Sequence, residues 1–350
     1  MQNPPAPGHQ PNPALFFETV QGYQRAFALK AAVEVELFTA IAKGNQTAPA
    51  IAAACQSSER GVRILCDCLT VLGFITKAEG RYSLTPDSAV FLDSRSPAYL
   101  GKSLNFLLHP NQRQNFERLT QTVRTGSQVD EARSTLSVED PIWVDFARGM
   151  APLTTQSAQA IVEYLRPALA KSNSPKILDI AAGHGMFGIA IARQFPGAQI
   201  YGLDWGSVLQ VAQENAQALG VADRYHQIAG SAFEADFGRG YDAVLLTNFL
   251  HHFDAPANEA LLKKVLAALN PGGQAVILEF VPNDDRISPP QAAMFSLVML
   301  GNTGKGDAYT FAELARMCSN AGLRNPRFVA IEPGFQSLVV AERATEINNQ

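Results

Sequence analysis

The sequence predicts an α/β protein that has a helical N-terminal part and a doubly wound, mostly parallel sheet in its C-terminal part. From Lys176 onward, short apolar strands alternate with helices, which is the pattern of a parallel sheet covered on both faces. The last two strands, 327–331 and 337–341, are separated by only a short turn, so this pair must be antiparallel. A chain of 350 residues is long enough for two domains.

The composition excludes several classes of protein. Apolar residues make up 47% and charged residues 17% of the chain, which is too apolar for a disordered protein. The 28 Lys and Arg residues face 32 Asp and Glu residues, so the basic excess typical of nucleic-acid binding is missing. No apolar run approaches the roughly 20 residues of a membrane span. We therefore expect neither a nucleic-acid nor a membrane partner.

The cysteines and the first residues bear on location and metals. The four cysteines match neither a zinc-binding spacing nor a disulfide framework, so we expect no metal and reduced thiols. The first 13 residues are rich in Pro, Asn and Gln and lack the features of a signal peptide. This predicts a disordered arm and a cytoplasmic protein.

The next elements predict a winged helix. Apolar residues recur at the helical period over 14–38. Thr47, followed closely by a proline, is expected to cap one helix, and Ser57 or Ser58 to cap a second. A hairpin should follow over 74–84.

A winged helix is often a DNA-binding module, so this function is an alternative. Cations and anions cancel across 47–87, and the second helix carries Cys66, Cys68 and Leu69 where a reader of base edges would carry polar side chains. Residues 14–38 are also more apolar than one winged helix can cover. Packing against a second copy of the chain is therefore the favoured interpretation.

The later elements follow in a regular order. Residues from about 100 to 170 are predicted to form helices and connections, including the amphipathic stretch 155–169. Predicted strands are 177–180, 199–203, 225–229, 241–247, 274–281, 327–331 and 337–341, and predicted helices are 185–194, 208–219, 258–269 and 310–321. The helix 258–269 is expected to stop at the sequence Asn-Pro-Gly-Gly.

A glycine-containing loop links the first of these strands to the first helix. Its small residues, ending in Gly183 and Gly185, let the backbone approach a ligand, and the following helix N-terminus offers N–H donors. Asp204 ends the second strand about 20 residues later, where a carboxylate can accept hydrogen bonds from both ribose hydroxyls. The loop lacks the third glycine of the dinucleotide fingerprint, and Asp179 precedes its glycines. These two features of the loop, together with the antiparallel strand pair at the end of the sheet, favour S-adenosyl-L-methionine over a nicotinamide dinucleotide as the ligand.

On these motifs, residues 176–343 resemble a class I methyltransferase domain. The whole chain from about Ala14 resembles the plant-type small-molecule O-methyltransferases, the family of the caffeic acid, chalcone and acetylserotonin enzymes and their bacterial relatives. The resemblance implies that the winged helix is a dimerisation domain and that the protein is a homodimer. The predicted domains are a disordered arm (1–13), a winged-helix dimerisation domain (14–100), a helical connection that contributes to the acceptor pocket (101–170) and a catalytic domain that binds S-adenosyl-L-methionine (171–345).

The resemblance also implies which residues bind the methyl donor. Gly183 and Gly185 would approach its methionine part, Asp204 would hold the ribose, and Trp205 and Phe233 would flank the adenine. The full expected set is Asp179, Gly183, Gly185, Asp204, Trp205, Ser231, Phe233 and Thr247.

Two departures from the family concern this donor site. The family usually has three glycines where this chain has Ala181, Ala182 and Gly183, and usually has Asp in place of Ser231. The extra methyl group narrows the loop, and a hydroxyl is a weaker acceptor than a carboxylate. We expect donor binding to be weakened, not lost.

The segment after the fourth strand carries the candidate catalytic residues. Methyl transfer requires the acceptor hydroxyl to lose its proton, and a neutral imidazole suits that role. In the family the base is the His of a His-Asp-Trp segment, which matches His251, with His252 and Phe253 in place of Asp and Trp. Glu279 matches a carboxylate that orients the base. In the alternative interpretation, His251 only packs beneath the donor, as in methyltransferases that use no base.

The remaining implied residues concern the acceptor. The family's second supporting Glu falls at Ala308, next to Asp307, so that contact is not expected to be kept in the same form. The family clamps an aromatic acceptor between two methionines, which match Met150 and Met299. The expected pocket residues are Phe146, Met150, Asn248, Met294, Met299 and Asn302.

The leading hypothesis is an O-methyltransferase that uses S-adenosyl-L-methionine to methylate a hydroxyl of a small aromatic or polyketide-like acceptor. The sequence does not distinguish methylation of oxygen from methylation of nitrogen or carbon. A second alternative is a non-methylating reaction on the same fold, such as hydroxylation or decarboxylation, and a third is a DNA-binding regulator.

Overall fold

The computed structural model describes residues 10–128 and 140–345, and these form two compact units. The first unit ends at Gly101 and the second begins at Lys102. Residues 1–9 of the predicted arm lie outside the described residues. Among the residues that are described, no helix is long and apolar enough to cross a membrane.

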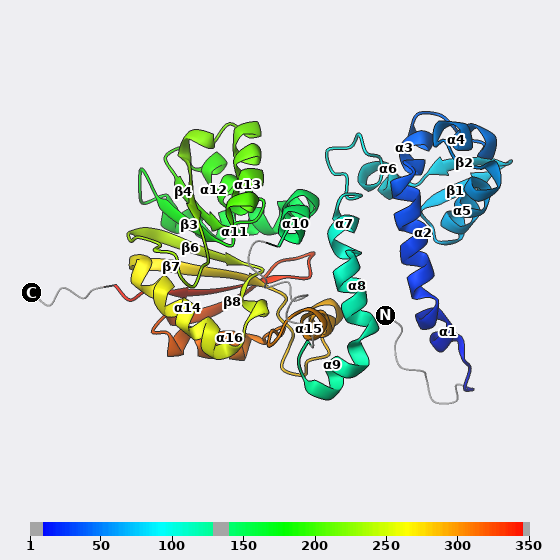
Figure 1. The fold of residues 1–350 in the computed structure, drawn as a ribbon. Helices are drawn as coiled ribbons and strands as arrows, with labels where there is room; N and C mark the ends of the chain where they lie inside the picture. Colours follow the sequence, from blue (N-terminus) through cyan, green and yellow to red (C-terminus); the bar gives the residue numbers. More distant parts are fainter. Residues whose placement is uncertain (1–9, 129–139, 346–350) are drawn as a thin grey trace, which may run out of the picture. The chain divides into compact units, whose positions relative to one another are not determined.

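The N-terminal unit is helical, with one small hairpin (Figure 1). Its elements are α1 (Ala14–Val20), α2 (Gly22–Glu34), α3 (Leu37–Ala42), α4 (Ala48–Ala54), α5 (Glu59–Val71), β1 (Ile75–Ala78), β2 (Arg81–Leu84) and α6 (Pro86–Phe91). The predicted caps are confirmed, because Thr47 accepts a hydrogen bond from the N–H of Ala50 and Ser58 from that of Gly61. The apolar stretch 14–38 is not one helix, since Glu36 takes a left-handed φ of 55° between α2 and α3.

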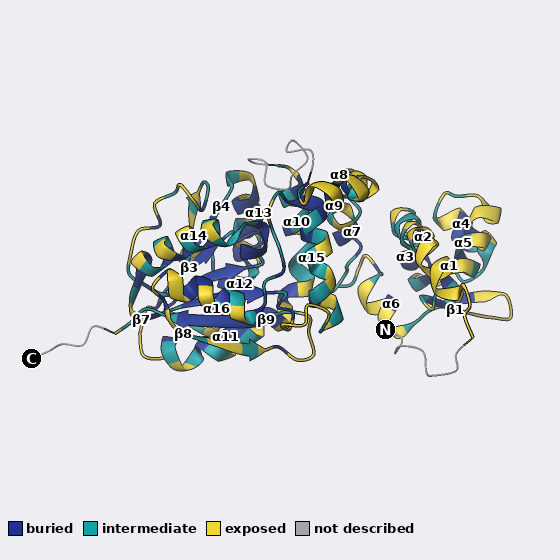
Figure 2. Cartoon of the chain, turned by 90° about the horizontal axis from the view of Figure 1, so that it is seen from below, coloured by how far each residue is buried: buried dark blue, intermediate teal, exposed yellow. Residues whose placement is uncertain are grey.

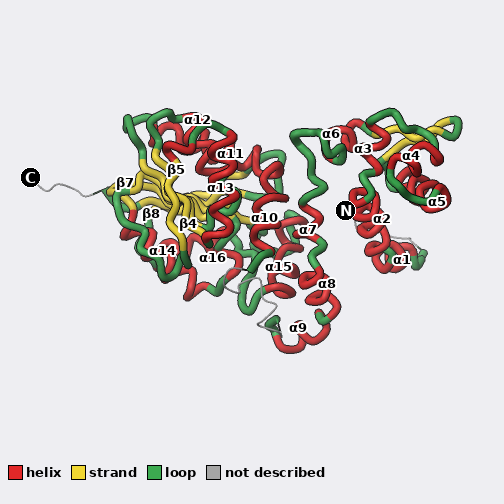
Figure 3. Tube along the Cα trace, turned by 45° about the horizontal axis from the view of Figure 1, so that its top comes forward, coloured by secondary structure: helices red, strands yellow, loops and turns green. Residues whose placement is uncertain are grey.

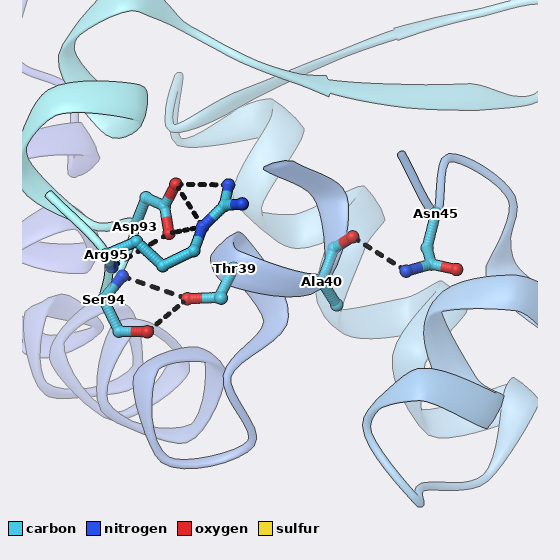
Figure 4. Close-up of polar contacts among 6 residues, drawn as sticks. All are labelled: Thr39, Ala40, Asn45, Asp93, Ser94 and Arg95. Carbon is cyan, nitrogen blue, oxygen red and sulfur yellow. Dashed lines mark hydrogen bonds and ion pairs between the residues drawn. The ribbon is translucent and has the colours of Figure 1, made fainter. Parts of the chain in front are cut away.

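Polar contacts fix the segment that follows α6 against α3 (Figure 4). Ser94 donates its backbone N–H to Oγ1 of Thr39 at 3.0 Å, and the two hydroxyls are also 3.0 Å apart. Arg95 is paired with Asp93, and the guanidinium lowers the pKa of that carboxyl. The end of this unit is therefore held by side-chain hydrogen bonds as well as by apolar packing.

The second unit begins with helices and continues into a seven-stranded sheet. The helices are α7 (Ser103–Leu107), α8 (Pro110–Glu117), α9 (Leu119–Thr125), α10 (Ile142–Met150) and α11 (Thr155–Leu169). The strands are β3 (Lys176–Ile180), β4 (Gln199–Asp204), β5 (Tyr225–Ala229), β6 (Tyr241–Thr247), β7 (Leu269–Glu279), β8 (Arg324–Ala330) and β9 (Ser337–Glu342). The helices between the strands are α12 (Met186–Gln194), α13 (Gly206–Ala218), α14 (Ala255–Ala268), α15 (Pro290–Asn302) and α16 (Phe311–Asn320).

The strand order is β5-β4-β3-β6-β7-β9-β8, and the predicted fold class is confirmed. The first five strands are parallel, whereas β9 runs antiparallel to both β7 and β8. Since β3 lies in the middle and the chain winds outward from it on both sides, the carboxyl ends of β3, β4 and β6 meet at one edge.

Two predicted boundaries were wrong around the helix before β7. We expected the helix to start at Asn258, but Asp254 caps it and α14 begins at Ala255. The helix does end before Asn-Pro-Gly-Gly, but the strand that we expected over 274–281 begins earlier, because β7 starts at Leu269 and includes these residues. The positive φ of Gly272, 76°, and the register shift opposite Tyr241–Ala243 accommodate the irregularity.

Helices cover both faces of the sheet (Figures 2 and 3). Apolar side chains of α11, α12 and α13 pack on one face, and those of α14 and α16 pack on the other. Strands β3 and β6 are buried along nearly their whole length, and β7 is buried from Ala275 to Glu279, as expected for the centre of a doubly wound sheet.

Candidate active site

The glycine loop, residues 181–185, follows β3 and leads into α12. Gly183 donates its N–H to Oδ2 of Asp204 at 2.8 Å, which joins the loop to the end of β4. Gly185 has a φ of 72°, and a Cβ there would lie 2.9 Å from both Ala212 Cβ and the hydroxyl of Tyr225. Ala181 adopts a φ of 54° although it carries a Cβ. Glycine adopts this left-handed conformation without the steric cost that a Cβ adds.

Asp204 is positioned to bind a diol. Its Oδ1 accepts the N–H of Trp205 at 2.7 Å, and its Oδ2 accepts the N–H of Gly183. Each carboxylate oxygen has two lone pairs, so each retains one for a ligand hydroxyl. Burial raises the pKa of Asp204 to about 6, against the lowering effect of the two N–H groups. The residues present therefore fit a ribose.

Asp179 lies beneath the loop and is fully buried. Its Oδ2 accepts the N–H of Gly188 in the first turn of α12 at 3.2 Å, while Oδ1 has no partner among the described residues. Burial raises the pKa of Asp179 to about 8. The same buried region holds the hydroxyl of Tyr225, which is likewise without a partner within the described part of the chain. Asp179 thus supports the loop from below, and it is expected to be largely protonated at neutral pH.

The predicted adenine-side residues come from two strand ends. Trp205, the N-cap residue of α13, is half-buried beside Val208 and Val211. Phe233 is 36% exposed, and its ring lies 4.8 Å from that of Phe253 in an edge arrangement. These two aromatic side chains belong to the carboxyl-end edge of the sheet.

The other two predicted donor-site residues are Ser231 and Thr247, and their environments differ. Ser231 accepts the N–H of Phe233 at 3.2 Å, so its hydroxyl oxygen already has one partner. Thr247, the last residue of β6, is buried.

A short polar contact at this edge joins His251 to Glu279. Nδ1 of His251 lies 2.5 Å from Oε2 of Glu279, and both side chains are buried. The other carboxylate oxygen accepts the backbone N–H groups of Phe249 at 3.0 Å and of His251 at 3.3 Å. A carboxylate that accepts from Nδ1 fixes the proton there and leaves Nε2 as the unprotonated nitrogen of a neutral imidazole.

Further groups hold the His251 segment in place. Asn258 is fully buried and donates Nδ2 to the carbonyl of Leu250 at 2.9 Å. The hydroxyl of Tyr309 donates to the carbonyl of Phe253 at 2.5 Å. The ring of Phe295 meets that of His251 edge-on, with 4.9 Å between centroids. The imidazole is therefore oriented by its backbone, its carboxylate partner and an aromatic ring.

His252 differs from its neighbour. Burial lowers the pKa of His252 well below its usual value, and its Nδ1 has no hydrogen-bond partner among the described residues. Its ring lies edge-on to Trp143 at 5.5 Å and 4.3 Å from the ring of His251. His252 is thus a neutral ring in an aromatic environment.

The family's second carboxylate, which the sequence places at Ala308 or the adjacent Asp307, does not support His251 here. Ala308 is buried, and Asp307 forms an ion pair with Arg286 at 3.2 Å. Instead, the loop after α15 packs on the base segment, because a Cβ on Gly306 would lie only 2.2 Å from the carbonyl oxygen of His251. The backbone of Gly306 therefore lies directly against that of His251.

An aromatic wall connects the glycine loop with the histidine pair, and we define it as Phe106, Trp143, Phe146 and His184. The rings of Phe106 and Phe146 are 5.0 Å apart, and those of Trp143 and Phe146 are 5.7 Å apart. Phe146 also stacks on His184 at 6.3 Å. Helix α10 therefore brings the predicted acceptor residue Phe146 against the donor loop.

The other predicted acceptor residues have different environments. Met150 is half-buried one turn after Phe146 on α10, and Met299 is buried on α15. Met294, on the same helix as Met299, is 65% exposed. The structure thus does not bury all three methionines alike.

The two predicted asparagines already have partners. Asn302 accepts from Nδ2 of Asn115 at 3.0 Å and donates to the carbonyl of Val298, so it joins α15 to α8. Asn248, with a φ of 55°, accepts from the amide of Gln336.

Several residues of this region were missed by the sequence analysis. Trp143, Phe295 and Asn258 come from three different helices and belong to no recognisable motif, whereas His184 lies in the glycine loop. His184 offered the clearest signal, because a histidine between two glycines of a ligand loop is a polar side chain at a close-approach position. Among the described residues no group of three His, Cys, Asp or Glu side chains is placed to hold a metal ion.

Comparisons with known proteins agree with this geometry. Residues 137–324 match the O-methyltransferase domain and residues 17–94 match the O-methyltransferase dimerisation domain. The 3-hydroxy-5-methyl-1-naphthoate 3-O-methyltransferase of Streptomyces sahachiroi is 30% identical over 336 residues, covering 95% of this chain and 96% of the relative. The tetracenomycin polyketide synthesis 8-O-methyl transferase TcmO of Streptomyces glaucescens is 26% identical, covering 96% of this chain and 98% of the relative.

Solved structures share the whole architecture. The crystal structure of a protein from Nostoc punctiforme, described as an O-methyltransferase, superimposes with a TM-score of 0.90. Its sequence is 50% identical to this chain, and the match covers 96% of this chain and 100% of that chain. Human N-acetylserotonin methyltransferase, solved in complex with S-adenosylmethionine, is 20% identical with a TM-score of 0.83, covering 97% and 100%. At that identity the human enzyme shows the fold alone.

The parallel sheet with its antiparallel last strand defines the fold of a class I methyltransferase. The matched domain covers more than half of the chain, and the naphthoate enzyme is similar over nearly its whole length. This chain belongs to the O-methyltransferase family.

Proposed function

We propose that the protein transfers a methyl group from S-adenosyl-L-methionine to a hydroxyl group of a small aromatic or polyketide-like acceptor, with His251 as the general base. The observation that carries this proposal is the buried His251–Glu279 pair at the same sheet edge as the glycine loop and Asp204. A ribose site and an oriented imidazole are the two parts that such a transfer needs.

The methyl donor supplies an electrophilic carbon on a positively charged sulfur, and the acceptor oxygen displaces the sulfur in line. The protein contributes the proton acceptor. As the new C–O bond forms, the acceptor's O–H bond breaks and Nε2 of His251 takes the proton. Glu279 then stabilises the imidazolium through Nδ1–H, because a negative carboxylate lies 2.5 Å away.

The energetic need for a base follows from the ordinary pKa values. A phenol titrates near 10 and a histidine near 6.5, so complete proton transfer before methyl attack would cost about 5 kcal/mol. Proton transfer that is coupled to attack avoids much of that cost. The carboxylate of Glu279 already accepts from Nδ1 of His251 and from two backbone N–H groups, so we assign the acceptance of this proton to Nε2 of His251.

The aromatic wall supports a flat acceptor. Its rings present faces and edges rather than charges, which suits an aromatic or polyketide-like ring system. The relatives named for naphthoate and tetracenomycin substrates make hydroxynaphthoates the first acceptors to test.

The test is a labelled-methyl screen across phenols, hydroxynaphthoates, flavonoids and quinone precursors. We expect acceptor-dependent formation of S-adenosylhomocysteine and a methyl ether, identified by mass and NMR. A product methylated on nitrogen or carbon would contradict O-methylation. If the acceptor is converted but no S-adenosylhomocysteine is formed, a non-methylating reaction on the same fold would be favoured.

We further propose a homodimer formed through the N-terminal unit, which matches a dimerisation domain. Large apolar side chains of α1 and α2 are exposed, among them Leu15 at 71% and Phe16 at 64%. An exposed apolar surface of this kind is typical of a protein–protein interface. Sedimentation should give a dimer at micromolar concentration, and a monomer would contradict the proposal. Location in the cytoplasm stays a prediction.

A further inference from the structure

His184 stands between the two glycines of the loop, and its hydrogen bonds fix its tautomer. Its Nδ1 accepts the backbone N–H of Met186 at 3.1 Å, so the ring proton of the neutral imidazole is on Nε2. The carbonyl of the same residue accepts from Nδ2 of Asn215 at 2.9 Å. Burial lowers the pKa of His184 to about 4, so the ring is neutral at physiological pH.

Two aromatic rings also pack against this imidazole. It stacks on Phe146 with an interplanar angle of 16°, and Phe187 lies 5.5 Å away on α12. The side chain is only 3% exposed. His184 is thus a rigid ring at the junction of the glycine loop and the aromatic wall.

One atom of this ring has no assigned role. The side-chain hydrogen bond of His184 within the described residues is made by Nδ1, so Nε2–H remains free to donate to a ligand. An N–H donor beside the N-terminus of α12 favours a negatively charged oxygen. The methyl donor carries one such group, the α-carboxylate of its methionine part.

We propose that His184 binds the α-carboxylate of the methyl donor through Nε2–H, as a neutral hydrogen-bond donor built into the glycine loop. The proposal rests on the proposed function only in that the loop binds S-adenosyl-L-methionine. It is independent of the role of His251. A neutral imidazole suits this task, because it donates to the carboxylate without adding a charge near the reacting sulfonium.

Two substitutions separate ligand binding from loop structure. His184→Asn keeps an oxygen near the position of Nδ1, where it can accept the N–H of Met186, but has no group at the position of Nε2. His184→Gln reverses this, because its amide N–H₂ reaches the position of Nε2. A purely structural role would favour the Asn variant, whereas a ligand-binding role favours the Gln variant.

The experiment measures by calorimetry, without acceptor, the affinity of each variant for two probes. One probe is S-adenosylhomocysteine. The other is its decarboxylated analogue, 5′-(3-aminopropylthio)-5′-deoxyadenosine, which keeps the nucleoside, sulfur and amine. We expect His184→Asn to weaken S-adenosylhomocysteine binding about tenfold or more and to leave the analogue within about twofold. His184→Gln should retain most of the wild-type affinity for S-adenosylhomocysteine.

Equal weakening of both probes by His184→Asn, or unchanged affinity for S-adenosylhomocysteine, would overturn the proposal. The wild-type protein gives a check that needs no variant. It should prefer S-adenosylhomocysteine over the decarboxylated analogue by at least about tenfold, and equal affinities would also contradict the proposal. Because no acceptor is present, these results do not depend on whether His251 is the base.

Discussion

The site has two ends, which we call the donor end (the glycine loop with Asp179 and Asp204) and the base end (His251 and Glu279). At the donor end, acidic side chains accept hydrogen bonds from backbone N–H groups, whereas at the base end two side chains contact each other. At the donor end, Gly183 and Trp205 donate to Asp204, and Gly188 donates to Asp179. At the base end, His251 and Glu279 meet directly. Backbone contacts depend on the loop geometry, while a side-chain pair depends on the identity of both residues. Substitutions should therefore affect binding at one end and chemistry at the other.

The largest expected effect comes from removing the proposed base, His251. His251→Ala should lower kcat by about 10² to 10⁴, because the proton acceptor matters in the transition state. The affinity for S-adenosylhomocysteine should change little, since Asp204 and the glycine loop are untouched. Steady-state kinetics and calorimetry measure the two quantities separately.

His252→Ala is the matched control for this prediction. Its ring packs against Trp143 and makes no ion pair, so the variant should lose stability more than turnover. Equal and mild effects of the two substitutions on kcat would contradict the contrast between the two ends.

Glu279→Gln tests whether the pair acts as a unit. The amide oxygen can still accept the N–H groups of Phe249 and His251, but its N–H₂ would face Nδ1 of His251. The imidazole would then keep its proton on Nε2 and lose its function as a base. We expect kcat to fall by about 10²-fold at unchanged affinity for S-adenosylhomocysteine. A variant with wild-type kcat would show that the tautomer of His251 is irrelevant.

Asp204→Ala should weaken ligand binding, in contrast to the substitutions at the base end, which should lower kcat. Loss of a charged acceptor for two hydroxyls should weaken the binding of S-adenosylhomocysteine by about 1.5 to 3 kcal/mol. With a pKa of about 6, the wild-type carboxyl should also lose affinity for this ligand as the pH falls from 7.5 to 5.5. The variant should lack that pH dependence. Affinity equal to that of the wild type would remove the ribose assignment.

The smallest expected effect concerns stability at the donor end. Burial raises the pKa of Asp179 from 3.8 to about 8, so the folded protein holds this proton more tightly than the unfolded chain does. The resulting stabilisation is complete below pH 3.8 and is lost progressively up to about pH 8. Asp179→Asn cannot ionise, so we expect its stability to rise relative to that of the wild type as the pH increases from 5 to 8.

Chemical denaturation at the two pH values measures this difference. Parallel stability curves for the wild type and the Asn variant would mean that Asp179 is ionised in the folded protein as it is in the unfolded chain.

The donor end could be predicted from the sequence because its geometry is local. A strand, a loop of small residues and a helix follow one another directly, and Asp204 ends the adjacent strand. The departure at Ala181 was also visible, although its left-handed conformation was not. Short connections between strands and helices leave few alternatives for where these groups can lie.

The base end was only partly predictable. The positions of His251 and Glu279 followed from the family resemblance, but their contact depends on the pairing of β6 with β7. The aromatic wall was out of reach, since Trp143 and His184 are joined through packing of α10 on the glycine loop. No periodicity in the sequence specifies such long-range packing. The position of Asp307 could not be foreseen either, because its partner Arg286 lies in an irregular segment.

The most direct test of the central claim varies the acceptor instead of the enzyme alone. The kcat of the wild type and of His251→Ala should be compared for two acceptors of the same shape, one an ordinary phenol and one carrying a substituent that ionises its hydroxyl at the assay pH. If His251 removes the proton, the variant should lose about 10² or more in kcat with the ordinary phenol and less than about tenfold with the ionised one. The same loss with both acceptors would show that His251 only shapes the site.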